Sequence, residues 1–178
     1  MDWSVLNQLK QMRLKPREKL TLVLDLDETL VWTELLPNGD LRIFVRLWVA
    51  PLLNYCINHS DQVSLVFWTL GKSWYAQHVL SVIRQYVPDL LRYDLLTPDN
   101  GFTGYKTMAR LREIYPDPIV VVDDADFNYV GDSNIIRVPP YNQEMILLKK
   151  ADRALIDVLD VVMSIVDNSR PEDQLYPS

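Results

Sequence analysis

Three continuous apolar runs predict the central strands of a parallel sheet. They cover residues 20–27 (LTLVLDLD), 63–70 (VSLVFWTL) and 118–124 (PIVVVDD). Such runs are typical of strands buried on both faces, as in a sheet that helices cover on each side. Longer stretches with helical spacing separate the runs, and this alternation is the pattern of an α/β fold. The pattern therefore predicts a doubly wound, Rossmann-like parallel sheet.

Helical spacing of apolar residues predicts the helices that connect and close this sheet. The predicted helices cover residues 72–86 and 105–115, and a longer amphipathic helix covers residues 149–167. An apolar stretch with helical character also occupies residues 50–59. A short strand is expected over residues 134–139. Strands and helices thus alternate over most of the chain.

The segment between the first two predicted strands has the pattern of a β-hairpin. The sequence PNGD at residues 37–40 is a turn signal, and LRIFVRLWV after it alternates as a strand does. We therefore expect a small hairpin insertion over about residues 31–50, and no full cap domain over the sheet. The polar, proline-punctuated stretch at about residues 167–178 is expected to be a flexible tail.

Length and composition favour a single domain over residues 1–178, with its core at about residues 19–166. The 178 residues are 48% hydrophobic, which is enough to bury a sizeable core. No apolar run is long enough to cross a bilayer, and the first residues lack the apolar stretch of a secretion signal. The single cysteine, Cys56, excludes an internal disulfide and a zinc site built from cysteines. We therefore expect a soluble protein of the cytoplasm or nucleus, and its oligomeric state stays open.

The net charge argues against a nucleic-acid partner. The formal charge of -6 at pH 7 repels a polyanion, because non-specific affinity for nucleic acids comes from Lys and Arg that neutralise phosphates. The densest basic cluster, at Arg13, Lys15, Arg17 and Lys19, is interpreted as a solvated flank before the first strand. Binding to nucleic acid is therefore unlikely on charge grounds, and no membrane association is expected.

The sharpest candidate for chemistry is DLDETL at residues 25–30, where the first predicted strand ends. Ligands of open parallel sheets bind at the carboxyl ends of the strands, so Asp25 and Asp27 stand where a reaction is expected. Two carboxylates this close together beside a buried strand repel one another and are costly to desolvate. A bound cation relieves this repulsion, and Mg²⁺ prefers such hard oxygen ligands.

A second pair of acids follows the third predicted strand. IVVVDDAD places Asp123 and Asp124 directly after an apolar run. Either pair alone is equally well explained as solvated loop carboxylates. Because the carboxyl ends of parallel strands meet at one edge of a sheet, two pairs at equivalent strand ends favour a shared metal site.

The chain resembles the haloacid dehalogenase superfamily of phosphotransferases, whose four motifs occur here in order. The motif residues are Asp25, Asp27 and Thr29, then Thr69 in VFWTLG, Lys106 in GYKTMARL, and Asp123 with Asp124. Within the superfamily, DLDETLVW, FWTLGKSWYAQHV and VVDDADFNYV resemble two related groups. These are the small phosphatases of the RNA polymerase II C-terminal domain and the nuclear LIM interactor-interacting factors. The likeness covers about residues 19–166 and implies the α/β fold of that superfamily.

Two positions depart from the pattern of this branch. Arg46 is followed by Leu47, whereas the branch has Arg-Pro after the hairpin. The fourth motif reads Asp-Asp-Ala-Asp at residues 123–126 instead of Asp-Asn-Ser-Pro. The second change still supplies an oxygen ligand at Asp124.

The resemblance implies a catalytic role for each of four side chains. Asp25 would attack phosphorus and form an aspartyl-phosphate, and Asp27 would act first as general acid and then as general base. Thr69 would donate a hydrogen bond to a phosphoryl oxygen. Lys106 would help to neutralise the charge on the phosphoryl group.

The resemblance also implies a magnesium site. Mg²⁺ would bind the Asp25 carboxylate, the Asp27 backbone carbonyl and Asp124. Asp123 would either bind the metal through water or orient Lys106. Which of Asp123 and Asp124 binds the metal directly is left open by the sequence.

Two other catalytic motifs fail. GKS at residues 71–73 lacks the preceding glycine of a nucleotide-binding loop, because that position is Val66. A cysteine-dependent phosphatase needs an arginine six residues after its nucleophile, and Gln62 stands there after Cys56.

The sequence therefore predicts a magnesium-dependent phosphatase that acts on phosphoserine or phosphothreonine in proteins or peptides. An open cleft without a cap suits a long substrate, because binding energy must come from contacts across the surface. One alternative is a phosphatase of nucleotides, polynucleotide ends or small metabolites. Another is a noncatalytic binding module on the same fold.

Overall fold

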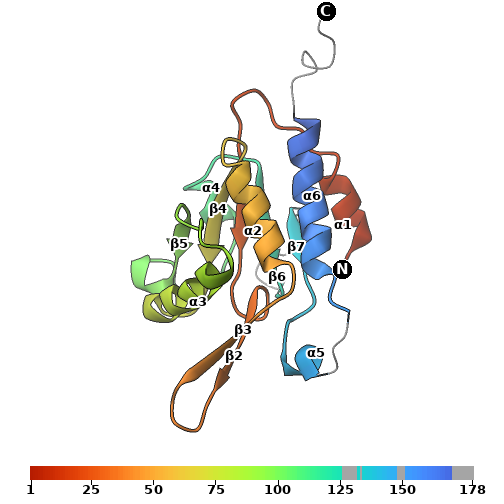
Figure 1. Cartoon of the computed structure of the whole chain (residues 1–178). Coiled ribbons are helices and arrows are strands. Elements are labelled where there is room, and N and C mark those ends of the chain that lie inside the picture. Colours follow the sequence, from red (N-terminus) through yellow and green to blue (C-terminus); the bar gives the residue numbers. More distant parts are fainter. Residues whose placement is uncertain (126–131, 133, 148–150, 170–178) are drawn as a thin grey trace, which may run out of the picture.

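A five-stranded parallel sheet forms the centre of the molecule. The structure is a computed structural model, and it describes residues 1–125, 132, 134–147 and 151–169. The strand order is β5-β4-β1-β6-β7 (Figure 1). The strands are β1 (Leu20–Leu24), β4 (Val63–Trp68), β5 (Asp94–Leu96), β6 (Ile119–Asp123) and β7 (Ile135–Arg137). β1 lies between β4 and β6, so three strand ends meet at the centre of the carboxyl edge.

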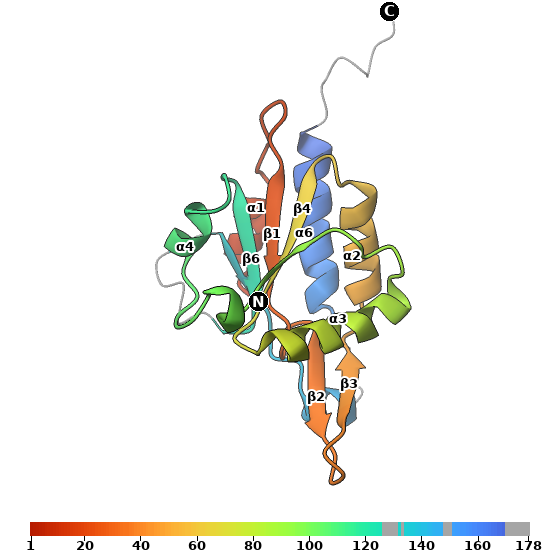
Figure 2. The same cartoon turned by 90° about the vertical axis from the view of Figure 1, so that its left-hand side faces the viewer.

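Helices pack on both faces of this sheet (Figures 1 and 2). The larger core joins one face to α1 (Trp3–Leu9), α2 (Val49–Asn58), α3 (Ser73–Tyr86) and α6 (Ala154–Asn168). On the other face, the short α4 (Met108–Arg112) packs Met108 and Leu111 near Val23 and Val121. The connections also contain η1 (Pro98–Asn100) and α5 (Gln143–Leu147). This is the doubly wound α/β architecture that the apolar pattern predicted.

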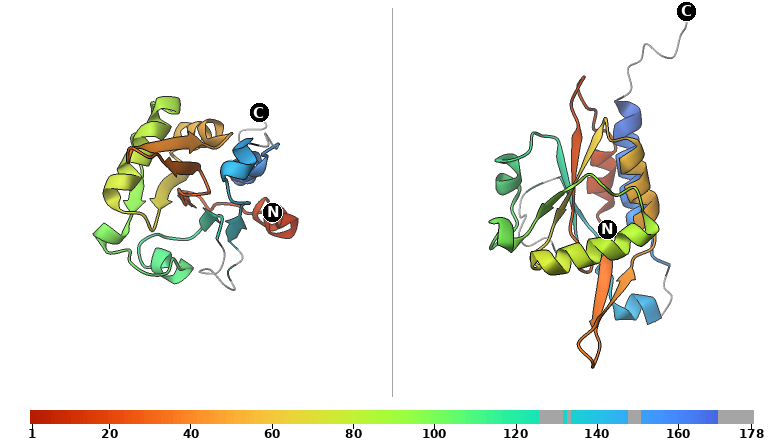
Figure 3. Two further views of the ribbon diagram at one scale, coloured as in Figure 1. Left: turned by 90° about the horizontal axis from the view of Figure 1, so that it is seen from below. Right: turned by 60° about the vertical axis from the view of Figure 1, so that its left-hand side comes forward.

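The predicted hairpin is present as a separate two-stranded sheet. β2 (Val31–Leu35) and β3 (Leu41–Val45) pair antiparallel along their whole length. Gly39 in the turn has a φ of +86°, a conformation that glycine adopts without strain. The rings of Trp32 and Phe44 lie 5.3 Å apart on this sheet. Figures 2 and 3 show the hairpin projecting beyond the carboxyl edge of the central sheet, with no second domain covering that edge among the described residues.

Two predicted helices have different bounds in the structure. The helix predicted over residues 105–115 is limited to Met108–Arg112, because Thr107 is extended and its side chain caps the helix by accepting from the amide of Arg110. The helix predicted over residues 149–167 begins only at Ala154. There the carboxylate of Asp152 accepts the Ala154 N–H at 3.2 Å. A side-chain cap thus determines where α4 begins, whereas α6 begins after Arg153 without one.

Several elements were not predicted, and one prediction falls largely outside the described residues. α1 follows an N-cap at Asp2, whose carboxylate accepts the amides of Ser4 and Val5. β5 and α5 are each too short to give a periodic pattern. α6 ends at Asn168, and residues 170–178 of the flexible tail predicted from about residue 167 lie outside the described part, so that prediction stays untested. Within the described residues, no helix has the length and apolar character needed to span a membrane.

Candidate active site

The candidate site lies where β1 and β6 end. Asp25 directly follows β1, and its amide donates to the carbonyl of Val122 in β6 at 3.0 Å. Asp123 is the last residue of β6, and Asp124 follows it. Because β1 and β6 run in parallel and in register from Thr21 to Leu24, their terminal acids reach the same edge. The two acidic pairs that the sequence singled out therefore stand side by side.

Three of the acids form a cluster with the geometry of a cation site. Carboxylate oxygens of Asp25, Asp123 and Asp124 all lie within 4.8 Å of one another. The hydroxyl of Thr29 lies 3.0 Å from Asp25 and 3.2 Å from Asp124, and it accepts the Asp124 amide at 3.0 Å. Thr29, a residue of the first motif, thus fixes the first acidic pair against the second.

Lys106 is buried between two of these carboxylates. Its ammonium donates to Asp25 and, at 2.9 Å, to Asp123. The side chain comes from the segment just before α4, where the cap at Thr107 fixes the backbone. Burial disfavours the charged form of Lys106, but attraction to Asp25 and Asp123 outweighs it and raises the pKa of the ammonium. Lys106 is therefore a permanent cation at this site.

The electrostatic balance of the cluster favours a further cation. Burial raises the pKa of Asp25 to about 7; Lys106 opposes this shift, and repulsion from Asp123 adds to it. Burial, followed by repulsion from Asp123, also raises the pKa of Asp124. The single charge of Lys106 is thus not enough to hold the pKa values of Asp25 and Asp124 at their ordinary level. Hard oxygen donors in this number and spacing fit Mg²⁺.

The side chain of Asp27 faces a different set of partners. One carboxylate oxygen accepts from the hydroxyl of Tyr75 in α3, and the other lies 3.4 Å from the hydroxyl of Thr69. The Tyr75 oxygen lies 2.8 Å from the hydroxyl of Thr33 in the hairpin. Since the single Tyr75 proton is directed to Asp27, Thr33 is the donor in that contact. Asp27 is therefore held apart from the three-acid cluster, and any part it takes in metal binding would be through its backbone carbonyl.

Thr69 lies at the end of β4, next to a glycine that the site requires. The Thr69 hydroxyl accepts the amide of Gly71 at 2.9 Å. A Cβ atom at Gly71 would lie 2.9 Å from the ring of Tyr75, closer than real contacts allow. Gly71 thus lets α3 begin close enough for Tyr75 to reach Asp27.

Two residues in this arrangement were missed by sequence reasoning. Tyr75 was seen only as part of a helix, although a tyrosine near the start of a helix that follows Thr69 was a usable signal. Arg46 was noted only as a departure from a motif. It is 2% exposed, pairs with Asp152 at 2.6 Å, and donates to the carbonyl of Thr29 at 3.1 Å. A charged residue at the end of an apolar strand pattern was the available signal for Arg46.

Asp126 of the fourth motif lies outside the described residues.

The fold and this constellation define a phosphatase of the haloacid dehalogenase type. Residues 20–173 match the family model of the NLI interacting factor-like phosphatases. The match spans most of the chain, so the chain belongs to that family, and the class inferred from the four motifs is confirmed. No curated protein sequence matches the chain significantly.

Solved structures share the fold at low sequence identity. Fcp1, described as an essential RNA polymerase II CTD phosphatase, aligns with a TM-score of 0.56 and 19% identity over 94% of this chain and 52% of that chain. Fission yeast Fcp1 bound to beryllium fluoride aligns with a TM-score of 0.55 and 19% identity, over 94% of this chain and 54% of that chain. A putative 3-deoxy-D-manno-octulosonate 8-phosphate phosphatase from Vibrio cholerae aligns with a TM-score of 0.53 and 9% identity, over 95% of this chain and 93% of that chain. The chain thus spans about half the length of the Fcp1 structures, and at these identities the likeness establishes the fold alone.

Proposed function

We propose that the protein is a magnesium-dependent phosphatase that hydrolyses phosphate monoesters through an aspartyl-phosphate on Asp25, with phosphoserine or phosphothreonine in proteins as its substrate. The observation that carries this proposal is the salt bridge of buried Lys106 to both Asp25 and Asp123, beside Asp124. A nucleophile, a fixed cation and a place for a second cation thereby adjoin the end of β1. This combination suits attack on a phosphate dianion.

In the first step, a carboxylate oxygen of Asp25 forms a bond to phosphorus while the bond to the leaving oxygen breaks. Asp27 gives its proton to that leaving oxygen. Lys106 and the Thr69 hydroxyl stabilise the charge on the phosphoryl oxygens. Lys106 also holds Asp25 in place, which reduces the reorganisation needed for attack.

In the second step, Asp27 takes a proton from water, and the resulting hydroxide attacks phosphorus. The bond between phosphorus and Asp25 breaks, which releases phosphate and restores the carboxylate. Asp27 is suited to both steps because the hydroxyl of Tyr75, a neutral donor on α3, fixes the orientation of its carboxylate. Burial, reinforced by the bond to Asp27, raises the pKa of Tyr75, so its hydroxyl stays a donor at neutral pH.

The residues present fit a magnesium ion. Asp25 and Asp124 supply hard oxygen ligands, the Asp27 backbone carbonyl is the proposed third, and Asp123 is engaged by Lys106. When bound there, Mg²⁺ would keep Asp25 ionised and neutralise charge on the phosphoryl oxygens. Asp123 is therefore proposed to orient Lys106 rather than to bind the metal directly.

The open carboxyl edge supports a macromolecular substrate. The hairpin at Trp32 and Phe44, and Trp48 at the start of α2, offer partly exposed apolar surface against which a peptide side chain could pack. Fcp1, a fold neighbour, is described as a CTD phosphatase. The net charge of -6 opposes a polynucleotide. Small sugar phosphates stay the second candidate, because the Vibrio cholerae neighbour is described as a sugar-phosphate phosphatase. We place this activity in a single phosphatase domain acting in the cytoplasm or nucleus.

The catalytic proposal is tested with Asp25→Asn and with chelation. Asp25→Asn removes the nucleophile and should abolish turnover of p-nitrophenyl phosphate, while circular dichroism reports an unchanged fold. Treatment of the wild type with excess EDTA should also abolish activity, and added Mg²⁺ should restore it. Full activity of Asp25→Asn would exclude the covalent route, and activity that persists in EDTA would exclude the metal.

The substrate proposal is tested with a panel of phosphoserine and phosphothreonine peptides, mononucleotides and sugar phosphates, each assayed with Mg²⁺. We expect the best phosphopeptide to have the highest kcat/KM. If a mononucleotide or sugar phosphate exceeds every phosphopeptide by more than about tenfold, roughly 1.4 kcal/mol in transition-state binding, the protein-substrate proposal is wrong. The covalent mechanism would be unaffected by that result.

A further inference from the structure

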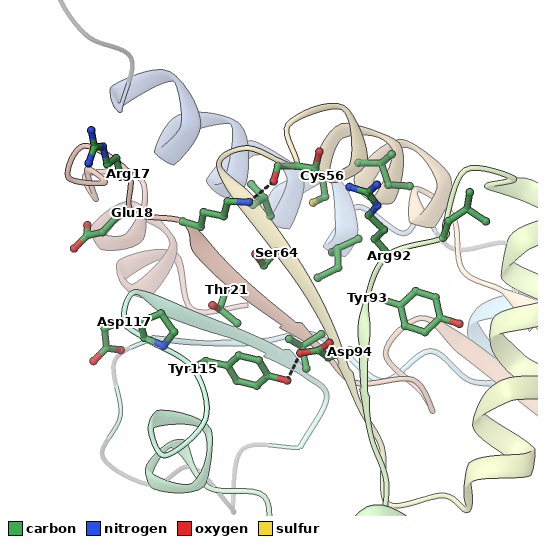
Figure 4. Close-up of a pocket in the computed structure, with 18 of the residues that line it drawn as sticks. Arg17, Glu18, Thr21, Cys56, Ser64, Arg92, Tyr93, Asp94, Tyr115 and Asp117 are labelled. Atoms are coloured by element: carbon green, nitrogen blue, oxygen red, sulfur yellow. Dashed lines mark hydrogen bonds between the residues drawn. The ribbon is translucent and has the colours of Figure 1, made fainter.

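A large cleft lies at the opposite end of the sheet from the acid cluster. Its volume is about 820 Å³, within the range of pockets that hold small organic molecules. The starts of β1 and β4 and the end of α2 line it, together with residues 89–94 and 115–117 (Figure 4). None of the proposed catalytic residues lines this cleft. Thr21 in the cleft precedes Asp25 by four residues, so about 13 Å of strand separates the cleft from the acid cluster.

The cleft exists because the sheet is incomplete on this side. β5 pairs only with residues 66–68 of β4. Residues 63–65 of β4 therefore have no strand partner on the β5 side within the described part of the chain. Figure 4 shows the segment before β5 running apart from β4 and leaving the gap open. The short α4 packs near Val23 and Val121 and leaves Thr21, at the start of β1, to line the cleft.

Two hydroxyl groups in the cleft have no hydrogen-bond partner among the described residues. Thr21 and Ser64 are partners in the β1–β4 register, and both line the cleft. Thr21 is only 3% exposed, yet neither side-chain oxygen has a hydrogen bond to a described residue. Two positions further along the same strands, Val23 and Val66 are apolar, as a buried parallel strand requires. Neither oxygen is among the fully buried polar atoms without a partner, so both hydroxyls are open to the cleft and can bond to a ligand there.

The basic side chains around the cleft are not neutralised. Arg17, Lys19 and Arg92 line it, and no ion pair between described residues includes any of them. The Lys19 ammonium donates to the carbonyl of Ser60 at the end of α2, at 2.8 Å. Figure 4 shows the Arg92 side chain on the α2 side of the opening. Basic side chains thus lie on more than one side of the apolar surface of the cleft.

The acids around the cleft are mostly engaged elsewhere. Asp94 accepts from the hydroxyl of Tyr115 at 2.8 Å, and Asp117 pairs with Arg112 at 3.4 Å. Glu18 accepts the amide of Lys15 at 2.7 Å. The side chains of Glu18 and Asp117 point away from the opening in Figure 4. The fourth acid, Asp89, is exposed to solvent, so the four acids and three bases that line the cleft give it no net positive charge, and an anionic group would be attracted locally, by Lys19 and Arg92.

We propose that this cleft is a second binding site, for a small molecule with an apolar body and one anionic group. Leu65, Val66 and Cys56 would contact the apolar body, since all three are buried and line the cleft. The hydroxyls of Thr21 and Ser64 would bond to polar atoms of the ligand. Lys19 and Arg92 would attract its anionic group, whether this is a phosphate, sulfonate or carboxylate.

The test uses two dyes that differ in charge. 8-Anilinonaphthalene-1-sulfonate is apolar with one anionic group, and N-phenyl-1-naphthylamine is its neutral analogue. Fluorescence titration of the folded protein should give saturable binding of the anion with one site per chain. Arg92→Gln and Lys19→Gln should each weaken binding of the anion about threefold and leave the neutral dye unaffected, because each removes one partly screened charge. Higher salt should weaken binding of the anion alone.

Matched variants define the site. Arg13→Gln removes an exposed basic residue from the same segment without touching the cleft and should change nothing. Leu35→Ser removes an exposed apolar side chain of the hairpin and should also change nothing. Ser64→Phe fills the cleft and should abolish binding of both dyes. Phosphatase activity should be unchanged in the Lys19 and Arg92 variants, so this test is independent of the proposed catalytic function.

The outcomes separate clearly. Weaker binding of the anion in both cleft variants but not in Arg13→Gln supports the site. Equal affinity in the wild type, Lys19→Gln and Arg92→Gln overturns it, as does loss of binding in Leu35→Ser. Thr21→Val tests the hydroxyl separately: it should change thermal stability little, because no described residue forms a hydrogen bond with this hydroxyl. A large loss of stability in Thr21→Val would show that the hydroxyl already has a partner, and would overturn its proposed role.

Discussion

Removal of the Tyr75 hydroxyl should impair the proposed proton transfer by Asp27 selectively. Tyr75→Phe keeps the ring that packs beside Gly71. It removes the Tyr75 hydroxyl, which among the described residues is the only donor to the first carboxylate oxygen of Asp27. The second oxygen keeps its long contact of 3.4 Å to Thr69. Asp27 should therefore stay in the site but lose its fixed orientation.

The size of the effect follows from the bond that is lost. A hydrogen bond to a charged group contributes about 1.5–3 kcal/mol, and Tyr75 is half-buried, so the lower end of that range applies. A loss of about 1.5 kcal/mol in the transition state corresponds to roughly a tenfold decrease in kcat/KM. This decrease is smaller than the rate acceleration of about 100-fold to 10,000-fold that a general acid supplies, as expected when the acid is misplaced but not removed.

The assay compares two leaving groups. Serine in a phosphopeptide is a poor leaving group and needs the proton from Asp27, whereas 2,4-dinitrophenolate leaves without one. We expect kcat/KM to fall about tenfold for the phosphopeptide and less than about twofold for 2,4-dinitrophenyl phosphate. kcat/KM is the appropriate constant because it reports the steps up to formation of the phosphoenzyme and excludes its hydrolysis. Tyr86→Phe, an exposed position near the end of the same helix, is the control and should match the wild type.

An equal decrease for both substrates would refute this reasoning. It would mean that Tyr75 supports the site as a whole, or contacts the phosphoryl group, instead of orienting the proton donor. No decrease for either substrate would mean that Asp27 does not depend on the Tyr75 hydroxyl.

Two further predictions concern buried groups. Arg46→Met should lower the free energy of unfolding in urea by about 3–5 kcal/mol, because it leaves the buried Asp152 carboxylate without its counter-charge. The double variant with Asp152→Leu should recover most of this loss. A loss that persists in the double variant would contradict the prediction. Cys56 should not react with a disulfide reagent in the native protein at pH 8 and should react fully in denaturant, since it is 1% exposed and burial raises the pKa of its thiol to about 12. Because the folded pKa lies above the ordinary thiol pKa of 9.0, this group favours folding below about pH 9 and loses that contribution as the pH rises towards 12.

The acid cluster is the part of the site that sequence could predict. Asp25 and Asp123 each end an apolar run, and parallel strands bring such ends to one edge whatever the register. Lys106 was predicted only from the order of the motifs, because nothing in its own segment indicates that it turns inward between two acids. The position of its helix depended on the cap at Thr107, which a periodic pattern does not reveal.

The residues that orient the site were beyond prediction for a different reason. Tyr75 and Asp27 are separated by 48 residues, and their contact depends on how α3 approaches the end of β1. Arg46 and Asp152 are separated by 106 residues, and neither has a local signal for its partner. Periodicity reports which face of an element is buried, whereas these polar pairs depend on the angles between elements. The cleft was likewise hidden, since it results from the β4–β5 pairing beginning only at Val66.

The bond between Arg46 and Asp152 has a consequence for biosynthesis. A chain made from its amino terminus exposes the loop at Asp25 and Thr29 long before Asp152 exists. Until then the Arg46 guanidinium, which holds the Thr29 carbonyl, has no buried counter-charge and stays in water. The nucleophile would thus be assembled only after the segment that carries Asp152 has left the ribosome. A nascent chain arrested before residue 152 should therefore be devoid of phosphatase activity, and a chain that includes α6 should gain it on release.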